Sequence, residues 1–238
     1  MAITVTTLGT AQNKASADPW TPFSSVALAT GDFLVLVVAC DDVSGYAHSF
    51  TWNGIALTQD VAVVNVGNVL VYILSLYVSS GATGNVVVDW NNSGIPTAMT
   101  ASLVKATDIA SSSPFDKTAQ STGANTEPTS TATATLTQAD ELGIGAVGTE
   151  GPDGDTAGTW TTGAGNVSGN EQRLGTTGGG AASNITVSSA AEVLSATTAQ
   201  TAAKTSITSR DWEAAVATYK GVATAAALKT RYQAILVG

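Results

Sequence analysis

The sequence is poor in charged and reactive side chains. Only 11% of its 238 residues are charged, against roughly 25% in ordinary soluble domains. It contains one cysteine, Cys40, and one histidine, His48. A single cysteine excludes an intrachain disulfide and any zinc site built from cysteines. A single histidine excludes a multi-histidine metal site and most Ser-His and Cys-His schemes. Cys40 closes an apolar run, so we expect a buried, inert thiol.

Basic residues are scarce as well. Nine Lys and Arg residues stand against eighteen Asp and Glu, and they are spread from Lys14 to Arg231 without forming a run. Phosphate binding needs clustered cations, so neither nucleic acid nor an anionic membrane is an expected partner. No apolar run approaches the roughly 18 residues that span a bilayer. Met1–Thr7 lacks the basic and apolar regions of a signal peptide, so we expect no standard export.

What the chain does have is apolar residues in strand patterns. Hydrophobic residues make up 44% of the sequence, enough for a buried core. Ile3–Leu8 alternates apolar residues with threonine, which indicates a half-buried strand. Phe33–Cys40 is continuously apolar, as in a central strand covered on both faces. Asn53-Gly54 is typical of a two-residue hairpin. Further strands are predicted at Val61–Val66, Val69–Val78, Val86–Trp90, Ala98–Ala106, Thr129–Leu136, Leu142–Val147, Thr159–Thr161, Gln172–Leu174, Ile185–Val187 and Trp212–Lys220.

The last residues have a different pattern. Ala223–Leu236 has helical spacing, although Ile235–Val237 would also fit a strand. We therefore expect a sandwich domain over residues 1–221 and an extension over residues 222–238. The extension is a candidate assembly arm, with a simple cap on the sandwich as the equal alternative. Its apolar face would consist of Leu228, Tyr232, Ile235 and Leu236.

The chain contains a weak internal repeat. Gly31–Leu36 recurs as Ala139–Ile144, and Trp160 lies 108 residues after Trp52, as Asp140 does after Asp32. We interpret this as two related sets of strands in one sandwich with pseudo-twofold character. Two tandem sandwiches are the alternative, because about 108 residues suffice for some seven short strands. The segment Thr107–Glu127 contains Phe115 and no charge run, so we expect a crossing strand or loop and not a free tether.

The order of these pieces is itself informative. The pieces are Ile3–Leu8, Phe23–Leu28, Gly31–Val35, Trp52, Val71–Ile73, Asn85–Val88, Ser113–Asp116, Ala139–Leu142 and Asp211–Tyr219. Over about residues 3–220 this order resembles a family of jelly-roll-like domains of phage structural proteins and bacterial surface or secreted proteins. The shared motifs are packing positions. The resemblance implies an all-β, antiparallel sandwich used for display, adhesion or assembly, with no catalytic residues to carry over.

Two sets of residues are candidates for ligand binding. Acidic residues on the glycine-bearing loop Glu150–Asp155 could offer oxygen ligands to calcium, although the spacing is not that of an EF-hand and a solvated loop is the simpler interpretation. Trp160, on a short strand among glycine-rich loops, and Trp20 are the two tryptophans whose exposure is open, and both could stack on sugar rings. Trp52, Trp90 and Trp212 fit strand patterns, so we expect them in the core.

These observations favour a non-enzymatic virion structural protein, most concretely a capsid decoration or cement protein. Its expected partners are other virion proteins, of capsid or tail, and copies of itself. The alternative is a glycan-binding module of a phage tail or cell surface. A hydrolase on a sandwich scaffold is the third hypothesis, and it lacks a nucleophile-base pair or a metal shell in the sequence. Fold alone does not decide among them.

Overall fold

The structure is a computed structural model that describes residues 2–41, 48–61, 69–91 and 94–223. Within them the chain is almost entirely extended, which confirms the all-β prediction, and one short 3-10 helix is present, η1 (Ala181–Ser183). None of these residues forms a helix long and apolar enough to cross a membrane. The strands are β1 Thr4–Asn13, β2 Trp20–Leu28, β3 Phe33–Asp41, β4 Ser49–Trp52, β5 Ile55–Ala56, β6 Thr58–Gln59, β7 Val69–Tyr77, β8 Ala82–Asp89, β9 Met99–Thr107, β10 Phe115–Gly123, β11 Glu141–Glu150, β12 Ala157–Trp160, β13 Gln172–Gly175, β14 Ile185–Leu194, β15 Lys204–Ile207 and β16 Trp212–Lys220.

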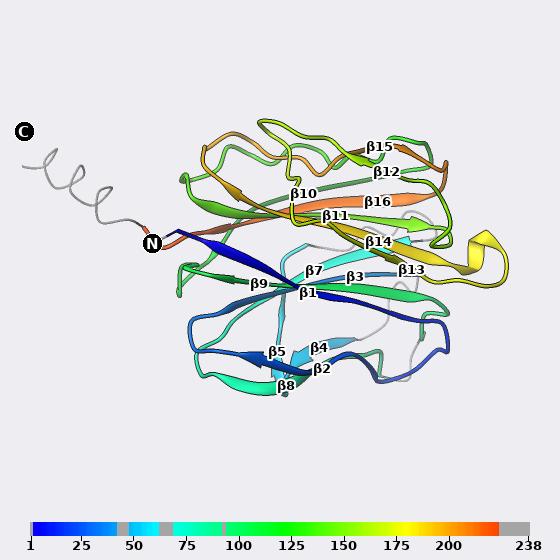
Figure 1. The fold of residues 1–238 in the computed structure, drawn as a ribbon, viewed down its shortest axis with the longest axis horizontal. Coiled ribbons are helices and arrows are strands. Elements are labelled where there is room, and N and C mark those ends of the chain that lie inside the picture. Colours follow the sequence, from blue (N-terminus) through cyan, green and yellow to red (C-terminus); the bar gives the residue numbers. More distant parts are fainter. Residues whose placement is uncertain (1, 42–47, 62–68, 92–93, 224–238) are drawn as a thin grey trace, which may run out of the picture.

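The strands form four stacked layers (Figure 1). The first half of the chain builds an inner sheet in the order β1-β9-β3-β7-β6 and an outer sheet in the order β2-β8-β4-β5. The second half builds an inner sheet in the order β10-β16-β11-β14-β13 and an outer sheet of β12 and β15. All these strand pairs are antiparallel. The two inner sheets lie face to face in the middle of the molecule.

Each half follows the connectivity of a jelly roll. In the first half the chain alternates between the two sheets, with β1, β3, β7 and β9 inside and β2, β4, β5 and β8 outside, which is the eight-strand jelly-roll arrangement. The second inner sheet repeats the first, with β10, β16, β11, β14 and β13 in the places of β1, β9, β3, β7 and β6. The sandwich fold and its internal repeat are therefore confirmed. Each half forms a sandwich of its own, as the tandem alternative expects, and a shared core joins them.

The repeated residues occupy equivalent places in the two halves. Asp32 directly precedes β3 and Asp140 directly precedes β11, the central strands of the two inner sheets. Trp52 is the last residue of β4, and Trp160 is the last residue of β12. The offset of 108 residues therefore marks a structural repeat and not a chance similarity.

Three apolar cores separate the layers. The central strand β3 serves two of them, because side chains alternate across a strand. Phe33, Val35 and Val37 face the second inner sheet, whereas Leu34 and Leu36 face the first outer sheet. All of β3 from Phe33 to Cys40 is fully buried, as its continuous apolar sequence predicted, and the Cys40 thiol is buried and free of any disulfide. The third core lies beneath β12 and β15 and includes Trp160 and Trp212.

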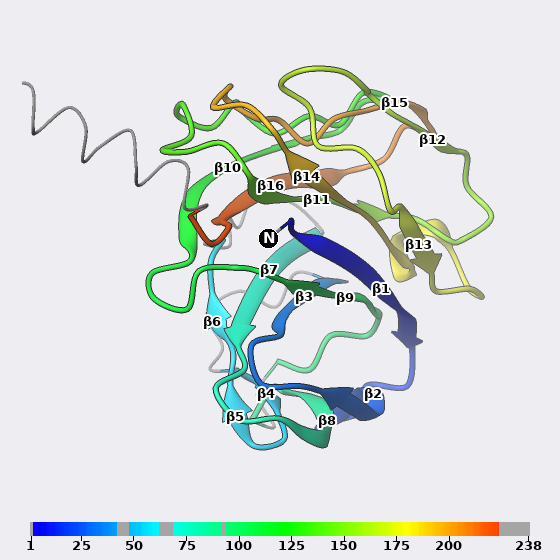
Figure 2. The same cartoon turned by 60° about the vertical axis from the view of Figure 1, so that its left-hand side comes forward.

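We call the core between the two inner sheets the seam. Large side chains of the first half meet small ones of the second there: a Cβ atom built on Gly148 of β11 would lie 2.6 Å from Cγ2 of Val71. Phe33 and Tyr219 pack across the seam with ring centroids 4.8 Å apart and ring planes tilted by 60°. The seam is also closed along one side, where β1 contacts β13 (Figure 2).

Buried polar contacts fix the two halves relative to each other. The carboxylate of Glu213 on β16 accepts a hydrogen bond from the backbone N–H of Val71 on β7 at 2.8 Å. The hydroxyl of Tyr219 donates to Asp60 at 2.8 Å, and the hydroxyls of Ser102 and Ser189 lie 2.7 Å apart. A buried polar group without such a partner is costly, so these bonds select one alignment of the two sheets.

Most predicted strands are present, with one clear error. Thr129–Leu136 is predicted as a strand, but it forms no regular ladder: it has one isolated bridge, from Thr129 to Ala203, and scattered backbone bonds such as that from the N–H of Thr133 to the carbonyl of residue 200 at 2.9 Å. The hydroxyls of Ser130 and Thr133 accept backbone N–H groups of residues 202 and 200 at 2.9 Å, so side chains take up donors that a ladder would use. Residues 107–127 contain the crossing strand β10, as expected.

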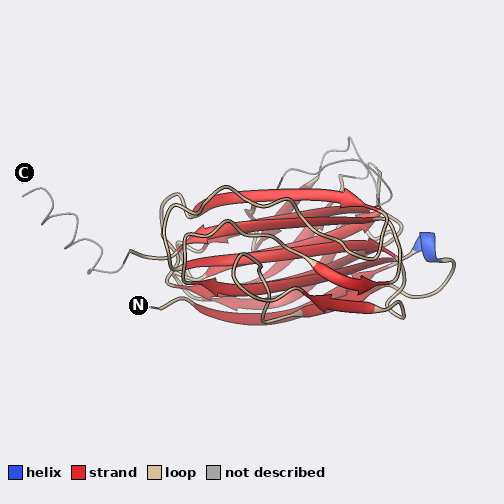
Figure 3. Cartoon of the chain, turned by 90° about the horizontal axis from the view of Figure 1, so that it is seen from above, coloured by secondary structure: helices blue, strands red, loops and turns tan. Residues whose placement is uncertain are grey.

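Local turns follow the sequence closely. Asn53 and Gly54 have φ values of 49° and 76°, and Trp52 pairs with Ile55 across them. Both central residues therefore adopt the left-handed conformation that a type I′ hairpin requires. Only Val61 of the predicted strand Val61–Val66 lies within the described residues. The strands run along the long axis, with the N-terminus at one end and η1 at the other (Figure 3).

Candidate functional site

The most unusual group of side chains surrounds Lys204 on β15. Lys204 is 4% exposed, and its Nζ donates to the hydroxyl of Ser188 on β14 at 3.1 Å. The same Nζ lies 5.3 Å from the ring centre of Trp160. Burial, and next the positive charge of Arg173, lower the pKa of Lys204 to about 8, although the charge of Glu171 opposes both. An ammonium group is thus held inside the second jelly roll.

Two arginines stand beside this lysine, each bound to an aspartate. Arg173 Nη1 donates to Asp153 at 2.9 Å, and its Nη2 donates to the backbone carbonyl of Asp155 at 3.2 Å. Arg210 donates two hydrogen bonds to the Asp155 carboxylate, from Nε at 2.7 Å and from Nη2 at 3.1 Å. These hydrogen bonds from Arg210 raise its pKa. The fork geometry is that of a bidentate ion pair.

These groups line a narrow cleft, which we call the basic cleft: Asp155, Arg173, Thr186, Ser188, Lys204 and Arg210. Its free space is about 10 Å³, about enough for one water molecule. Three cations and one carboxylate face it, and they come from separate strands and loops. Chemically the cleft offers N–H and O–H donors to a very small ligand.

The acidic loop forms ion pairs with two arginines. Asp153 and Asp155, the candidate calcium ligands, each bind an arginine, and the Asp153 side chain remains exposed to solvent, as the simpler interpretation of a solvated loop expects. Among the described residues no group of three or more His, Cys, Asp or Glu side chains is arranged to hold a metal ion. The arginines lie 20 and 55 residues along the chain from their aspartates, so local spacing gave no signal of the pairing.

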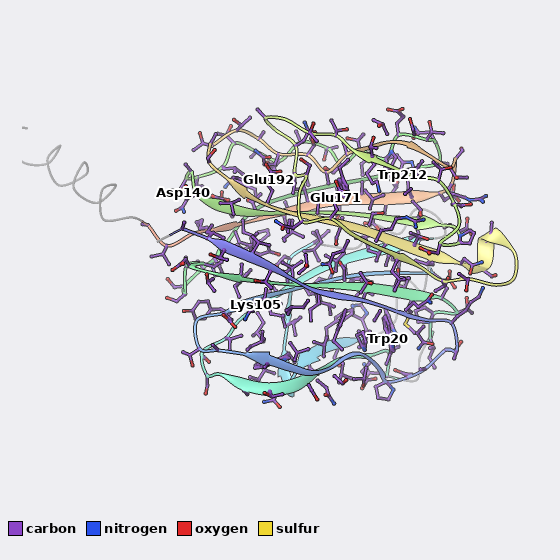
Figure 4. All side chains as sticks on the ribbon, in the orientation of Figure 1. Trp20, Lys105, Asp140, Glu171, Glu192 and Trp212 are labelled. Atoms are coloured by element: carbon purple, nitrogen blue, oxygen red, sulfur yellow. The ribbon has the colours of Figure 1, made fainter. Side chains whose placement is uncertain are left out.

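The two tryptophans considered for sugar stacking are not exposed. Trp160 is 6% exposed and Trp20 is 7% exposed. Trp160 belongs to the core beneath β12 and β15, and Trp20 belongs to the core beneath the first outer sheet. Figure 4 shows Trp20 in the lower jelly roll, and Trp212, which lies in the same core as Trp160, in the upper one. The expectation of open aromatic faces at these two positions is wrong, whereas Trp52, Trp90 and Trp212 lie in the core as predicted.

The candidate arm falls outside the described residues. Leu228, Tyr232, Ile235 and Leu236 all lie beyond residue 223. The structure does show where the extension starts: the backbone N–H of Val222 donates to the carbonyl of Asp108 at 2.8 Å. Val222 is 44% exposed, and Phe115, which pairs with Tyr219 at the same end of β16, is 37% exposed. Two apolar side chains thus reach solvent where the extension begins.

A second pair of titratable groups lies near that point. Glu141, the first residue of β11, is fully buried beside Thr218 and Asp116. Burial, and then the charge of Asp116, raises the pKa of Glu141 to about 7. Burial also raises the pKa of Asp116, but hydrogen bonds from Thr137 and Lys117 outweigh it and lower that pKa overall. As pH rises, Asp116 therefore loses its proton before the adjacent Glu141 does.

The single histidine belongs to an aromatic cluster. The ring centre of His48 lies 5.2 Å from Phe50, 5.1 Å from Tyr72 and 5.6 Å from Trp90. The contacts are edge-on or tilted, as aromatic packing prefers. His48 therefore packs at the margin of the core beneath the first outer sheet.

Comparison of this chain with protein-family models, with curated proteins and with solved structures finds no match.

Proposed function

We propose that this protein is a non-enzymatic structural component of a virion, most concretely a capsid decoration or cement protein. The observation that carries the proposal is a tandem pair of jelly rolls whose chain has only 11% charged residues. Jelly rolls are common in viral capsid proteins, which is an analogy at the level of the fold. The centres of protein interfaces are depleted in charged residues, so a surface of this kind suits extensive contact with neighbouring proteins.

The extension gives the proposal a physical route. It leaves β16 beside the exposed side chains of Phe115 and Val222. An arm starting there would bury apolar area against a neighbouring subunit. Because the protein would bind the assembled shell and not its separate subunits, its binding would shift the equilibrium toward the assembled shell. The arm would then anchor the pair of sandwiches to the shell.

Quantitative mass spectrometry of purified particles tests the proposal. We expect this chain at a fixed copy-number ratio to the major shell protein, resistant to washing at high salt. Absence from particles, or a ratio that varies between preparations, would contradict it. Saturable binding of the free chain to a glycan array would favour a receptor-binding role instead.

A truncation separates the arm from the body. A chain ending at Ala223 should unfold with an unchanged Tm but should no longer bind particles that lack the protein. The matched control is Thr230→Ser in the full chain, which leaves the apolar face of the extension intact and should bind normally. A truncated chain that still binds particles would show that the extension is a cap and not an arm.

A further inference from the structure

The basic cleft contains one positive charge more than its own residues neutralise. Arg173 is paired with Asp153, and Arg210 is paired with Asp155. Lys204 has no carboxylate within ion-pair distance among the described residues, and Ser188 provides its one hydrogen bond there. Glu171 acts on it only through its charge. Burying an unpaired ammonium is expensive, so this arrangement calls for a counter-charge.

The donors in the cleft are available to a ligand. An ammonium group has three N–H donors, and Lys204 spends one of them on Ser188. Because Ser188 accepts that bond, it keeps its own O–H proton to donate. The Trp160 ring beside Nζ excludes water from that side. Lys204 and Ser188 thus present convergent donors at one point of the cleft.

The size of the cleft restricts the ligand. About 10 Å³ of free space admits one atom of roughly the size of a water molecule. A phosphate, a sulfate or a carboxylate of a sugar or peptide is too large. A monatomic anion comes nearest to this volume and supplies the single negative charge that Lys204 lacks.

We propose that the basic cleft binds one halide ion, chloride under ordinary conditions, between Lys204 Nζ and the Ser188 hydroxyl. The ion neutralises the buried ammonium and joins β15 of the outer sheet to β14 of the inner sheet. It therefore stabilises the second jelly roll from inside. This site does not depend on the proposed virion role, because it concerns the stability of the isolated chain.

Thermal unfolding of the full chain at constant ionic strength tests the site. Sodium chloride or bromide replaces sodium gluconate, whose anion is too large for the cleft. We expect a saturable rise in Tm of about 2–4 °C once the halide exceeds its Kd several-fold. An unchanged Tm, or a rise that does not saturate, would overturn the proposal.

Two lysine variants show whether the effect arises in the cleft. Lys204→Met should abolish the dependence on halide, because the counter-charge is no longer needed. The matched control is Lys105→Met: Lys105 lies in the first jelly roll (Figure 4) and already has a carboxylate partner, Asp32, at 3.2 Å. This variant should keep the full dependence. Equal halide responses in wild type and Lys204→Met would refute the assignment.

Two further measurements use the unaltered chain, in case Lys204→Met does not fold. Crystals grown in bromide should show an anomalous peak beside Lys204 Nζ, and a cleft without such a peak would overturn the site. The halide effect should also fade as pH rises through about 8, where Lys204 loses its proton. The other charged groups that line the cleft are Arg173, Arg210 and Asp155; Asp153 is paired with Arg173, and Glu171 acts on Lys204 through its charge. A halide effect that persists undiminished well above pH 9 would contradict the role of the ammonium.

Discussion

The two jelly rolls share a strand order but fill it in different ways. In the first, the core beneath the outer sheet contains Trp20, Phe50, Trp52, Tyr72 and Trp90, and the outer sheet has four strands. In the second, the outer sheet has two strands, and irregular segments complete the layer. The central strands of the two inner sheets also differ in side-chain size: β3 (FLVLVVACD) has large apolar residues where β11 (ELGIGAVGTE) has glycine and alanine.

This difference shows how one topology can be stabilised by two kinds of interaction. Large aromatic and aliphatic side chains give the first half most of its apolar burial, which scales with the area removed from water. Alanine and glycine in the second half bury less area but allow close approach of the sheets. Hydroxyl-to-backbone bonds at Ser130 and Thr133 and ion pairs at Asp153 and Asp155 supplement that smaller core. The second half is therefore expected to respond more strongly to pH and to ions.

The largest expected effect compares the two repeat-related tryptophans. Trp52→Ala should lower the free energy of unfolding by about 3–5 kcal/mol, since it empties a fully buried site and removes the bond from Nε1 to the carbonyl of Val26 at 3.2 Å. Trp160→Ala should cost less, because its core is smaller and its loss opens Lys204 to water. Urea unfolding of both variants measures the difference. A larger loss for Trp160→Ala would reverse the comparison.

A smaller loss is expected at the seam. Gly148→Ala should lower the free energy of unfolding by about 1–3 kcal/mol, because the new Cβ would lie 2.6 Å from Val71 Cγ2 and 3.1 Å from Ala39 Cβ. The control is Gly154→Ala, where no atom lies within 4 Å of the added Cβ. Chemical denaturation compares the two. Equal stabilities would mean that the inner sheets do not pack as closely as described.

The pH response of the second half depends on Glu141. Its carboxyl keeps a proton up to about pH 7 when folded, against 4.5 as the ordinary value. Its contribution to stability is therefore complete below pH 4.5 and is lost as pH rises to about 7. Between pH 5 and pH 8 the wild-type chain should lose up to about 3 kcal/mol of its free energy of unfolding relative to Glu141→Gln, which lacks the titrating carboxyl. Urea titrations at both pH values measure it, with Glu127→Gln, an exposed site, as the control. A wild-type chain that gains stability over this range relative to Glu141→Gln would contradict the assignment.

The smallest effect is expected from the ion pair at the rim of the basic cleft. Asp155 and Arg210 are both partly exposed, so their pair should contribute about 1 kcal/mol or less. A double-mutant cycle with Asp155→Asn and Arg210→Gln isolates the coupling. A coupling of several kcal/mol would indicate that the cleft is drier than its exposure suggests.

The sequence predicted the parts of the fold that large side chains determine. Phe33–Cys40 and Val69–Val78 form central strands because a continuous apolar run can be satisfied only by cover on both faces. Alternation is a weaker guide: Thr129–Leu136 alternates, but its hydroxyl groups accept the N–H groups of Gln200 and Ala202, which a partner strand would donate to backbone carbonyls. The pairing of β1 with β9 joins residues about a hundred apart, and only tertiary structure determines it.

The basic cleft could not be predicted from the sequence either, because only the tertiary structure brings its residues together. Lys204, Arg173, Arg210 and Asp155 are scattered along the second half, and jelly-roll connectivity brings them together. One local signal was present: Gln200, Ala202 and Lys204 alternate inward in the segment that leads into β15, so a lysine stands where an apolar residue is expected. A charged residue at a position that the alternation places in the core is a sign of a buried charged site.

Native-state hydrogen exchange most directly tests whether the two jelly rolls form one unit through the seam. Amides of β3 and β11 should open with the same free energy and the same dependence on denaturant, because neither inner sheet can separate without exposing the seam. If β11 exchanges through an opening of markedly lower free energy while β3 stays protected, the halves unfold independently and the shared core does not couple them.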